Sequence, residues 1–331
     1  MRNQELLGPW VRRFLIEHLI AERSLSVHTQ HGYRDTLRLL LPFVASKARA
    51  PVDRLNVVDI SATVVRQFLA HLERDRHCSV ATRNQRLAAL HALARFVGEH
   101  SPEHVDWCTQ IRLIPHKRGN RTLISYLTEA EMRALLAAPR QSTSQGYRDY
   151  VLLLFLYNSG ARASEAASLR IQDVDTQSRF VRIIGKGRKQ RVCPLWPVTI
   201  GHLRTLMGQR HDDAPLFQNR LQQPITRFGI HTLVERHAAH AVEREPSLRS
   251  KRVSPHTIRH STATHLLRAG VDINTIRGWL GHASINTTNV YAEVDLDTKA
   301  KALAACSPGN SGRSRSPWKS AAGVMDFLRS L

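Results

Sequence analysis

The sequence predicts a mainly α-helical protein with a small β-sheet, in which a helical N-terminal domain precedes an α+β domain. Apolar residues recur at helical spacing through the first hundred residues. This periodicity stops between about 101 and 125, and two β-prone runs, 180–184 and 191–195, follow later in the chain. A length of 331 residues suggests two domains, and a hydrophobic content of 42% is sufficient for two packed cores.

Residues 1–105 are expected to form a domain of four helices. Ser61 and Ser79 each stand just before an apolar stripe, where a hydroxyl accepts hydrogen bonds from the free amides of a first helical turn. Arg83 and Arg86 in the fourth helix are candidate DNA contacts, although each could equally belong to a solvated helix face. The stripes of the first three helices span residues 10–19, 37–44 and 64–72.

A basic linker is expected at 106–125, because helical periodicity is lost in this region and glycine and proline interrupt regular structure. Lys117, Arg118 and Arg121 give the segment positive charge, so they are candidate contacts to DNA phosphates. Linkers are polar in any case, so the same charges also fit a purely solvated strap.

The second domain, 126–305, is expected to begin with a helix whose first turn carries a capping box formed by Thr128 and Glu131. A buried apolar helix follows, and Gly160 ends it. Arg162 therefore lies at a helix junction, where its side chain can leave the core.

Two pairs of polar residues have the spacing of neighbours on one helical face. Glu165 follows Arg162 by three residues, so its carboxylate can orient the guanidinium group, a plain surface ion pair being the alternative. His256 and Arg259 have the same spacing after a Ser-Pro helix start, so both can face one phosphate.

A β-hairpin is expected where 180–184 and 191–195 flank a turn that contains two glycines. The turn carries three basic residues, Lys186, Arg188 and Lys189. A solvated tip is one interpretation. The other is a tip whose basic residues bind a polyanionic partner.

The charge balance indicates a polyanionic partner, because 48 Lys and Arg residues outnumber 27 Asp and Glu residues and the net charge is +21. No apolar run approaches the roughly 20 residues needed to span a bilayer, and the N-terminus lacks a signal-peptide pattern. We therefore expect a cytoplasmic protein that binds nucleic acid and not a membrane. The four cysteines are too dispersed for a disulfide framework. No metal is expected, because His256, His260 and His265 lack a convincing third ligand.

The order and spacing of these polar residues resemble the tyrosine recombinase (phage integrase) family, which includes the XerC and XerD site-specific recombinases. The family pattern runs Arg, Lys, His-x-x-Arg, His, Tyr along one catalytic domain. Any single element is expected by chance in a chain of this length, whereas the ordered set is specific. The matching positions are Arg162, Lys186, His256, Arg259, His282 and Tyr291.

The resemblance implies a reaction in which Tyr291 attacks a phosphodiester and forms a 3′-phosphotyrosine and a free 5′-hydroxyl. Lys186 is the expected general acid, chosen over Lys189 because its Gly-Lys-Gly register is similar to that of the family. Since one ester replaces another, the reaction needs no cofactor.

The remaining matched residues are expected to stabilise charge. Arg162 and Arg259 bind the non-bridging oxygens of the scissile phosphate, and Glu165 orients a catalytic cation. His282 adds to the positive field around the phosphate, and His256 assists the proton transfers.

The resemblance also implies the assembly. The N-terminal domain is expected to be a core-binding domain that clamps double-stranded DNA at specific recombination sites, and a homotetramer exchanges strands through a Holliday junction. A partner recombinase or an accessory DNA-bending protein can take part. The segment 306–331 is a tail with an apolar end, expected to dock as a helix on a neighbouring protomer, with docking in cis as the alternative. We expect a bacterial, nucleoid-associated enzyme of a mobile element, acting in integration, excision or transposition.

Two other functions share these features. A type IB topoisomerase uses similar chemistry to relax DNA, but that group usually has lysine at the position of His256. A non-catalytic DNA-binding factor would be expected to lack Tyr291 or one of the arginines, whereas this chain has every catalytic type.

Overall fold

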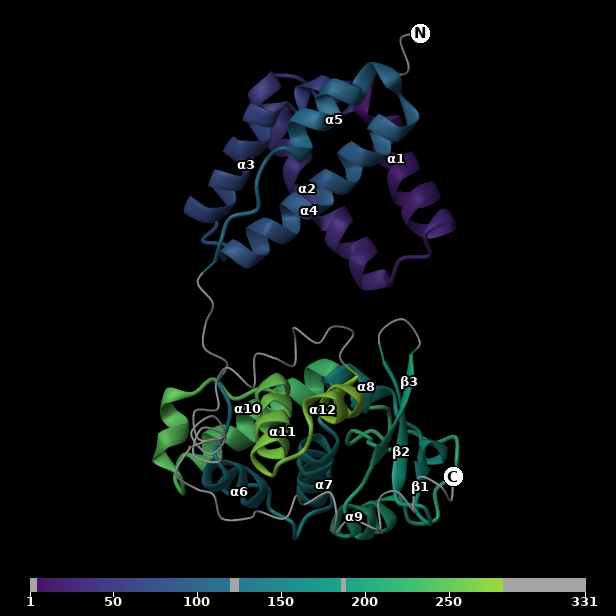
Figure 1. Cartoon of the computed structure of the whole chain (residues 1–331), viewed down its shortest axis with the longest axis vertical. Helices are drawn as coiled ribbons and strands as arrows, with labels where there is room; N and C mark the ends of the chain where they lie inside the picture. The colour runs from purple at the N-terminus through teal and green to yellow at the C-terminus, as the bar shows by residue number, and fades with distance from the viewer. Residues whose placement is uncertain (1–4, 120–124, 186–188, 282–331) are drawn as a thin grey trace, which may run out of the picture. The chain divides into compact units, whose positions relative to one another are not determined.

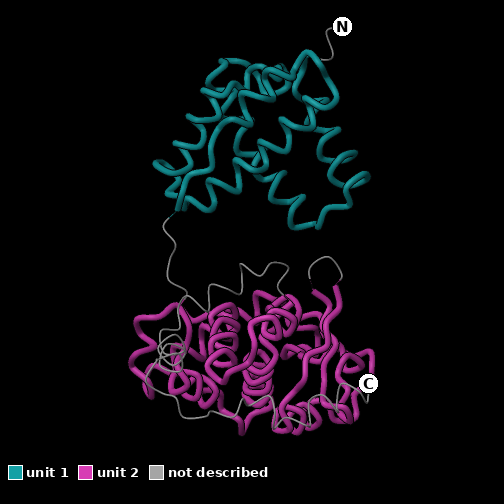
Figure 2. Tube along the Cα trace, in the orientation of Figure 1, with its two compact units in different colours: residues 1–121 teal, residues 122–331 magenta. Residues whose placement is uncertain are grey.

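The computed structural model describes residues 5–119, 125–185 and 189–281 (Figure 1). The chain divides into two compact units, residues 1–121 and 122–331 (Figure 2). Helices dominate both units and the second contains a three-stranded sheet, which confirms the predicted fold class. No described helix has the length and apolar content needed to cross a membrane. Several positions discussed above lie outside the described residues: Arg121, Lys186, Arg188, His282, Tyr291 and 306–331.

The first unit contains helices whose N-termini carry the expected caps. The hydroxyl of Ser61 accepts from the amide of Val64 at 3.3 Å, and that of Ser79 accepts from the amide of Thr82 at 3.2 Å. These bonds fix the starts of two long helices, which pack their apolar faces into one core. The elements are α1 (Leu7–Arg12), the π-helix η1 (Arg13–Glu22), α2 (Val27–Ala48), α3 (Ala62–Arg74), α4 (Val80–His100) and α5 (Val105–Arg112), with 3-10 turns at Val52–Arg54, Val57–Asp59 and Pro102–His104.

Helix α5 occupies the first part of the segment that we expected to be linker. Cys108 and Ile111 of this helix are buried in the core of the first unit, and the indole Nε1 of Trp107 donates to the carbonyl of Ile60 at 2.9 Å. Gly98 permits this close packing, since a Cβ at that position would lie 2.7 Å from the Cβ of Cys108. Eight residues are too few for a clear apolar period, so this helix could not be predicted from periodicity.

The second unit surrounds α7 with other helices, and Figure 1 shows its sheet at one side of them. The strands are antiparallel in the order β1-β2-β3, and β2 pairs with β3 in the register Ile184↔Gln190 and Val181↔Cys193. The expected hairpin is therefore present. The elements are α6 (Glu129–Ala137), α7 (Ser144–Ser159), α8 (Ala163–Ser168), β1 (Val174–Asp175), β2 (Phe180–Ile184), β3 (Gln190–Pro194), α9 (Pro197–Met207), α10 (Arg227–Ala241), α11 (Pro255–Arg268) and α12 (Ile273–Leu280), with 3-10 turns at Ile171–Asp173 and Pro246–Ser250.

Helix α7 forms the centre of the second core. Its residues 151–156 are all buried, and it packs against α6, α9 and α11. The expected capping box at the start of α6 is also present, because Glu131 accepts from the amide of Thr128 at 2.7 Å and Thr128 accepts from that of Glu131 at 3.2 Å. A rigid central helix fixes where the chain emerges at Gly160, and the candidate site begins there.

Candidate active site

Gly160 ends α7 in the left-handed conformation, with φ of +58°. Two features require glycine at this position. A non-glycine residue is strained at this φ, and a Cβ would overlap Cδ2 of the fully buried Leu280. The turn brings the end of α7 against the end of α12 and directs the Gly160 carbonyl towards Arg259.

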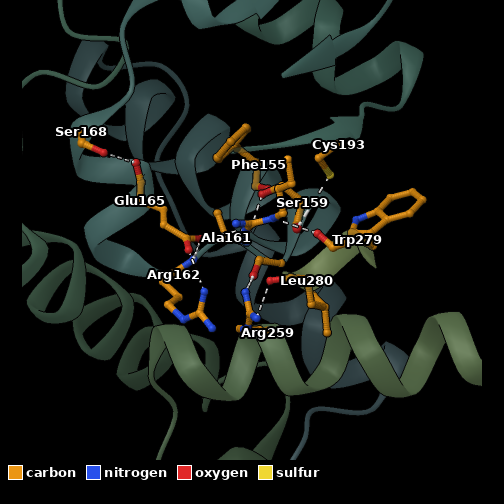
Figure 3. Close-up of polar contacts among 12 residues, drawn as sticks. Phe155, Ser159, Ala161, Arg162, Glu165, Ser168, Cys193, Arg259, Trp279 and Leu280 are labelled. Carbon is orange, nitrogen blue, oxygen red and sulfur yellow. Dashed lines mark hydrogen bonds and ion pairs between the residues drawn. The ribbon is translucent and has the colours of Figure 1, made fainter. Parts of the chain in front are cut away.

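Arg162 is the N-cap residue of α8, and Glu165 lies in the first turn of the same helix. The carboxylate of Glu165 accepts from the backbone amide of Arg162 at 2.9 Å through Oε2, and from its Nη1 at 2.7 Å through Oε1. The Arg162 side chain is 32% exposed and that of Glu165 only 4%, so the carboxylate is a buried support for a guanidinium group that reaches solvent (Figure 3).

Arg259 lies near the start of α11 and is buried, with an exposure of 3%. Its Nη1 donates to the carbonyl of Gly160 and its Nη2 to the carbonyl of Leu280, each at 2.6 Å (Figure 3). Two fixed carbonyls therefore set the plane of the guanidinium group. Because Arg162 follows Gly160 by two residues, one short segment of backbone positions both arginines.

His256 lies one turn before Arg259 at the surface of α11, where neighbouring atoms crowd its imidazole. This partial desolvation, followed by the positive charges of Arg259 and Arg162, lowers the pKa of His256. The imidazole is therefore neutral at pH 7 and can accept a proton. His256 and Arg162 line a pocket of about 240 Å³, which is completed by Ala163, Ser164, Arg227, Phe228, His231 and Pro255.

The two other histidines of α11, His260 and His265, are partly buried within the protein. His265 Nδ1 lies 2.7 Å from the hydroxyl of Tyr157, and burial lowers the pKa of His260 to about 4, with smaller effects from His256 and Arg259. Within residues 5–119, 125–185 and 189–281, no three His, Cys, Asp or Glu side chains are placed to hold a metal ion.

Arg191 was not singled out from the sequence, yet the structure places it beside the predicted site. Its Nη2 donates to Glu165 Oε2 at 2.8 Å and its Nε to the carbonyl of Trp279 at 3.0 Å. Strand alternation was the available signal, because Arg191 shares the inner face of β3 with the buried Cys193. Burial and the two hydrogen bonds distinguish it from the basic residues of the hairpin turn.

The candidate DNA contacts of the first unit have other partners. Arg83 is buried and its Nη1 donates to Asn84 Oδ1 at 2.9 Å and to the carbonyl of Pro115 at 3.1 Å, and Arg86 Nη1 donates to the carbonyl of Gly32 at 3.0 Å. These contacts favour the interpretation that both arginines serve helix packing. Lys117 and Arg118 are exposed, and Lys117 pairs with Glu73 at 2.9 Å. In the second unit, Lys189 is also exposed.

Comparisons with known proteins cover both units. Residues 125–297 match the model described as "Phage integrase family", and residues 11–99 match "Phage integrase, N-terminal SAM-like domain". A protein of Sinorhizobium fredii named "Putative integrase/recombinase y4rC" is 39% identical over 334 residues, which span 100% of both chains. Tyrosine recombinase XerC of Pelobacter propionicus is 32% identical over 293 residues, or 87% of this chain and 91% of that protein.

Solved structures share the fold. XerH site-specific recombinase bound to palindromic difH substrate, in a post-cleavage complex, matches with a TM-score of 0.65 at 23% identity, covering 85% of this chain and 80% of that chain. The Tn1549 transposon integrase in complex with circular intermediate DNA matches with a TM-score of 0.64 at 16% identity, covering 89% and 97%.

Proposed function

Since this chain belongs to the phage integrase family of tyrosine recombinases, enzymes that cleave and rejoin DNA, we propose that the matched polar residues are its active site and Tyr291 its nucleophile. The observation that carries this proposal is that two arginines from different helices, Arg162 and Arg259, meet at the backbone turn that begins with Gly160. Arg162 and Arg259 are both fixed through Gly160 and its neighbours, as expected for groups that hold one phosphate. Their rigid placement fits stabilisation of a transition state better than loose electrostatic attraction.

The two guanidinium groups would bind the non-bridging oxygens of the scissile phosphate. Negative charge increases on these oxygens as the phosphorane forms. A preorganised donor at such a position typically lowers the activation free energy by about 3 kcal/mol. Glu165 and the carbonyls of Gly160 and Leu280 hold the donors in place before DNA binds. Little reorganisation is then needed during the reaction.

The proton transfers fall to the other matched residues. A free tyrosine phenol has a pKa near 10, so Tyr291 needs a surrounding positive field, to which we propose that His282 contributes, in order to attack at neutral pH. Neutral His256 is suited to accept a proton beside the phosphate. Lys186 protonates the departing 5′-oxygen. The 3′-phosphotyrosine ester retains the energy of the broken ester, so a second 5′-hydroxyl can reverse the exchange without a cofactor.

Double-stranded DNA with specific recombination sites is the proposed substrate. The net charge of +21 favours binding to a polyanion. A mobile-element role in integration, excision or transposition is supported by the name of the full-length relative y4rC, an integrase/recombinase. We propose a homotetramer on DNA, formed in the cytoplasm at the nucleoid, and a partner recombinase or DNA-bending protein fits the same scheme.

The tail is proposed to assemble this tetramer by docking residues 306–331 on a neighbouring protomer. Deletion of 319–331 should then abolish tetramer assembly and recombination while leaving the DNA affinity of a single protomer nearly unchanged. Recombination at the parental rate by the truncated chain would contradict docking in trans.

The experiment that tests the chemistry is denaturing capture of protein-linked DNA from cells that express the chain, with Tyr291→Phe as the control, followed by sequencing of the attached ends. Tyr291-dependent 3′-linked ends at a recurrent sequence are expected for a site-specific recombinase. Ends scattered over the genome would instead favour topoisomerase-like relaxation. Tight DNA binding without any adduct would indicate a non-catalytic DNA-binding factor, and adducts retained in Tyr291→Phe would refute the nucleophile assignment.

A further inference from the structure

The guanidinium group of Arg191 lies where strand β3, helix α8 and the end of α12 meet. Through Glu165 it is connected to Arg162, and through the chain at Trp279 it is connected to the carbonyl that holds Arg259. We propose that Arg191 is a positioning residue for recombination, one that fixes both phosphate-binding arginines without itself contacting DNA. This inference rests on the proposed function of the site.

The first connection runs through a shared carboxylate. Oε2 of Glu165 accepts from Arg191 Nη2 at 2.8 Å and from the backbone amide of Arg162 at 2.9 Å, while Oε1 accepts from Arg162 Nη1 at 2.7 Å. Arg191 therefore binds the same oxygen that holds the backbone of Arg162. A rotation of the carboxylate away from Arg191 would break both hydrogen bonds to Arg162.

The second connection runs through the end of α12. Arg191 Nε donates to the carbonyl of Trp279, and the next carbonyl, that of Leu280, accepts from Arg259 Nη2. Gly281 follows with φ of +66°, and a Cβ there would lie 3.0 Å from Cδ of Arg191. The Arg191 side chain thus packs directly against this backbone turn. Because its guanidinium group also bonds to Glu165, it holds the turn in a fixed position relative to Arg259.

The burial of Arg191 separates its role from that of the exposed basic residues of the hairpin. Its side chain is 9% exposed, compared with 32% for Arg162, and both of the groups it binds are internal. The hydrogen bonds of Arg191 are made to Glu165 and to the carbonyl of Trp279, and through these two groups it acts on Arg162 and Arg259.

The charge of Arg191 also affects the ionisation of Glu165. Burial raises the pKa of Glu165, but the hydrogen bond from the Arg191 side chain lowers it below its ordinary value overall, together with the Arg162 amide, the charge of Arg191 and the hydrogen bond from the Arg162 side chain. The described charged groups that pair with Glu165 are Arg162 from α8 and Arg191 from β3. Without the cation on β3, the buried carboxylate should protonate at a higher pH and then release Arg162.

Two substitutions separate the charge of Arg191 from its two-pronged geometry. Arg191→Gln removes the charge, so Glu165 is protonated more readily. The fall in cleavage rate on the acid side of the pH profile, the acid limb, should therefore shift to higher pH. Arg191→Lys keeps the charge, so the acid limb should stay at the parental pH. A single ammonium group cannot reproduce the fork that spans Glu165 and Trp279, so this variant should still cleave more slowly.

The assay measures single-turnover adduct formation between about pH 5 and pH 8 on a duplex carrying the recurrent sequence recovered by adduct capture. Arg191→Gln should be slower at pH 7 by roughly tenfold or more, with DNA affinity within about twofold of the parent. Arg182→Gln is the matched control, because Arg182 is exposed on the adjacent strand β2 and its loss changes the net charge equally.

The outcomes are distinguishable. A parental rate in Arg191→Gln, a slower rate with the parental pH profile, or the same shift in Arg182→Gln would overturn the inference. If Arg191→Gln does not fold, Arg191→Lys decides, since a folded Lys variant with the parental rate also overturns it. A parent protein that forms no Tyr291-dependent adduct would refute the proposed function itself, whereas normal parental cleavage with unaffected variants refutes only the role of Arg191.

Discussion

Substitution of Gly160 by alanine tests whether the turn at the end of α7 positions Arg162 and Arg259. Gly160 has φ of +58°, and an added methyl group would overlap Cδ2 of Leu280, which is fully buried. The left-handed backbone costs an L-residue about 1–2 kcal/mol. Overpacking of a well-packed core adds about 1–3 kcal/mol. The free energy of unfolding of the second unit should therefore fall by about 2–5 kcal/mol.

Calorimetric melting of the full chain measures this change. For a unit of this size the melting temperature should fall by roughly 4–20 °C. Gly270→Ala is the matched control, because Gly270 also has a positive φ, +84°, but has no atom within 4 Å of the position of its Cβ. Only the backbone cost applies there, about 1–2 kcal/mol. Equal losses in the two variants would refute the argument that Leu280 blocks a side chain at position 160.

The same substitution should also slow cleavage by the folded protein. The carbonyls of Gly160 and Leu280 hold the two nitrogens of Arg259 at 2.6 Å, so displacement of either backbone segment moves the guanidinium group. A shift approaching 1 Å at a reacting centre can cost up to about a hundredfold in rate. Adduct formation by folded Gly160→Ala at the parental rate would show that Arg259 does not depend on this turn.

Three further substitutions test separate parts of the site and fold. Arg259→Lys cannot bind both carbonyls, so adduct formation should fall by roughly a hundredfold while DNA affinity changes little, as measured by single-turnover cleavage and gel shift. Lys186→Ala should cleave normal DNA poorly but recover on a duplex with a 5′-bridging sulfur, whose leaving group needs no proton, and a lack of recovery would assign the general acid elsewhere. Asp149→Asn should lower the unfolding free energy at pH 7 by about 3 kcal/mol, because the carboxylate is buried beside His237 and Arg148. Burial raises the pKa of Asp149 but these partners lower it overall, so its stabilisation is present above about pH 4 and is lost as pH falls through the folded-state pKa. Urea unfolding at several pH values should therefore show the two proteins converging in acid, and a constant difference would contradict this.

Local signals in the sequence were sufficient for most of the framework. The hydroxyls of Ser61 and Ser79 cap their helices, and Thr128 and Glu131 form the capping box, because each interaction needs only residues two or three positions apart. The hairpin followed from two β-prone runs around glycines. The short helix α5 was missed, since its burial depends on contacts with α3 and α4 that no local period reveals.

The candidate site shows a different limit. The sequence supplied the types and order of the polar residues, but not the groups that hold them. Arg259 bonds to carbonyls 99 and 21 residues away, and Arg191 bonds to Glu165 and to Trp279, 26 and 88 residues away. A backbone carbonyl has no identity in the sequence, so these partners become visible only when the fold brings α7, β3, α11 and α12 together.

The contacts around the site form a closed path, and this determines how substitutions should be interpreted. From Arg162 the path runs to Glu165, then to Arg191, along the end of α12 to Arg259, and back through Gly160 to Arg162. A change at any member should be transmitted to both arginines that we propose to bind the phosphate, so the losses from two members should be less than additive. The rate lost in one variant is therefore a property of the path, and only double-mutant cycles can separate a residue that touches the phosphate from one that positions another.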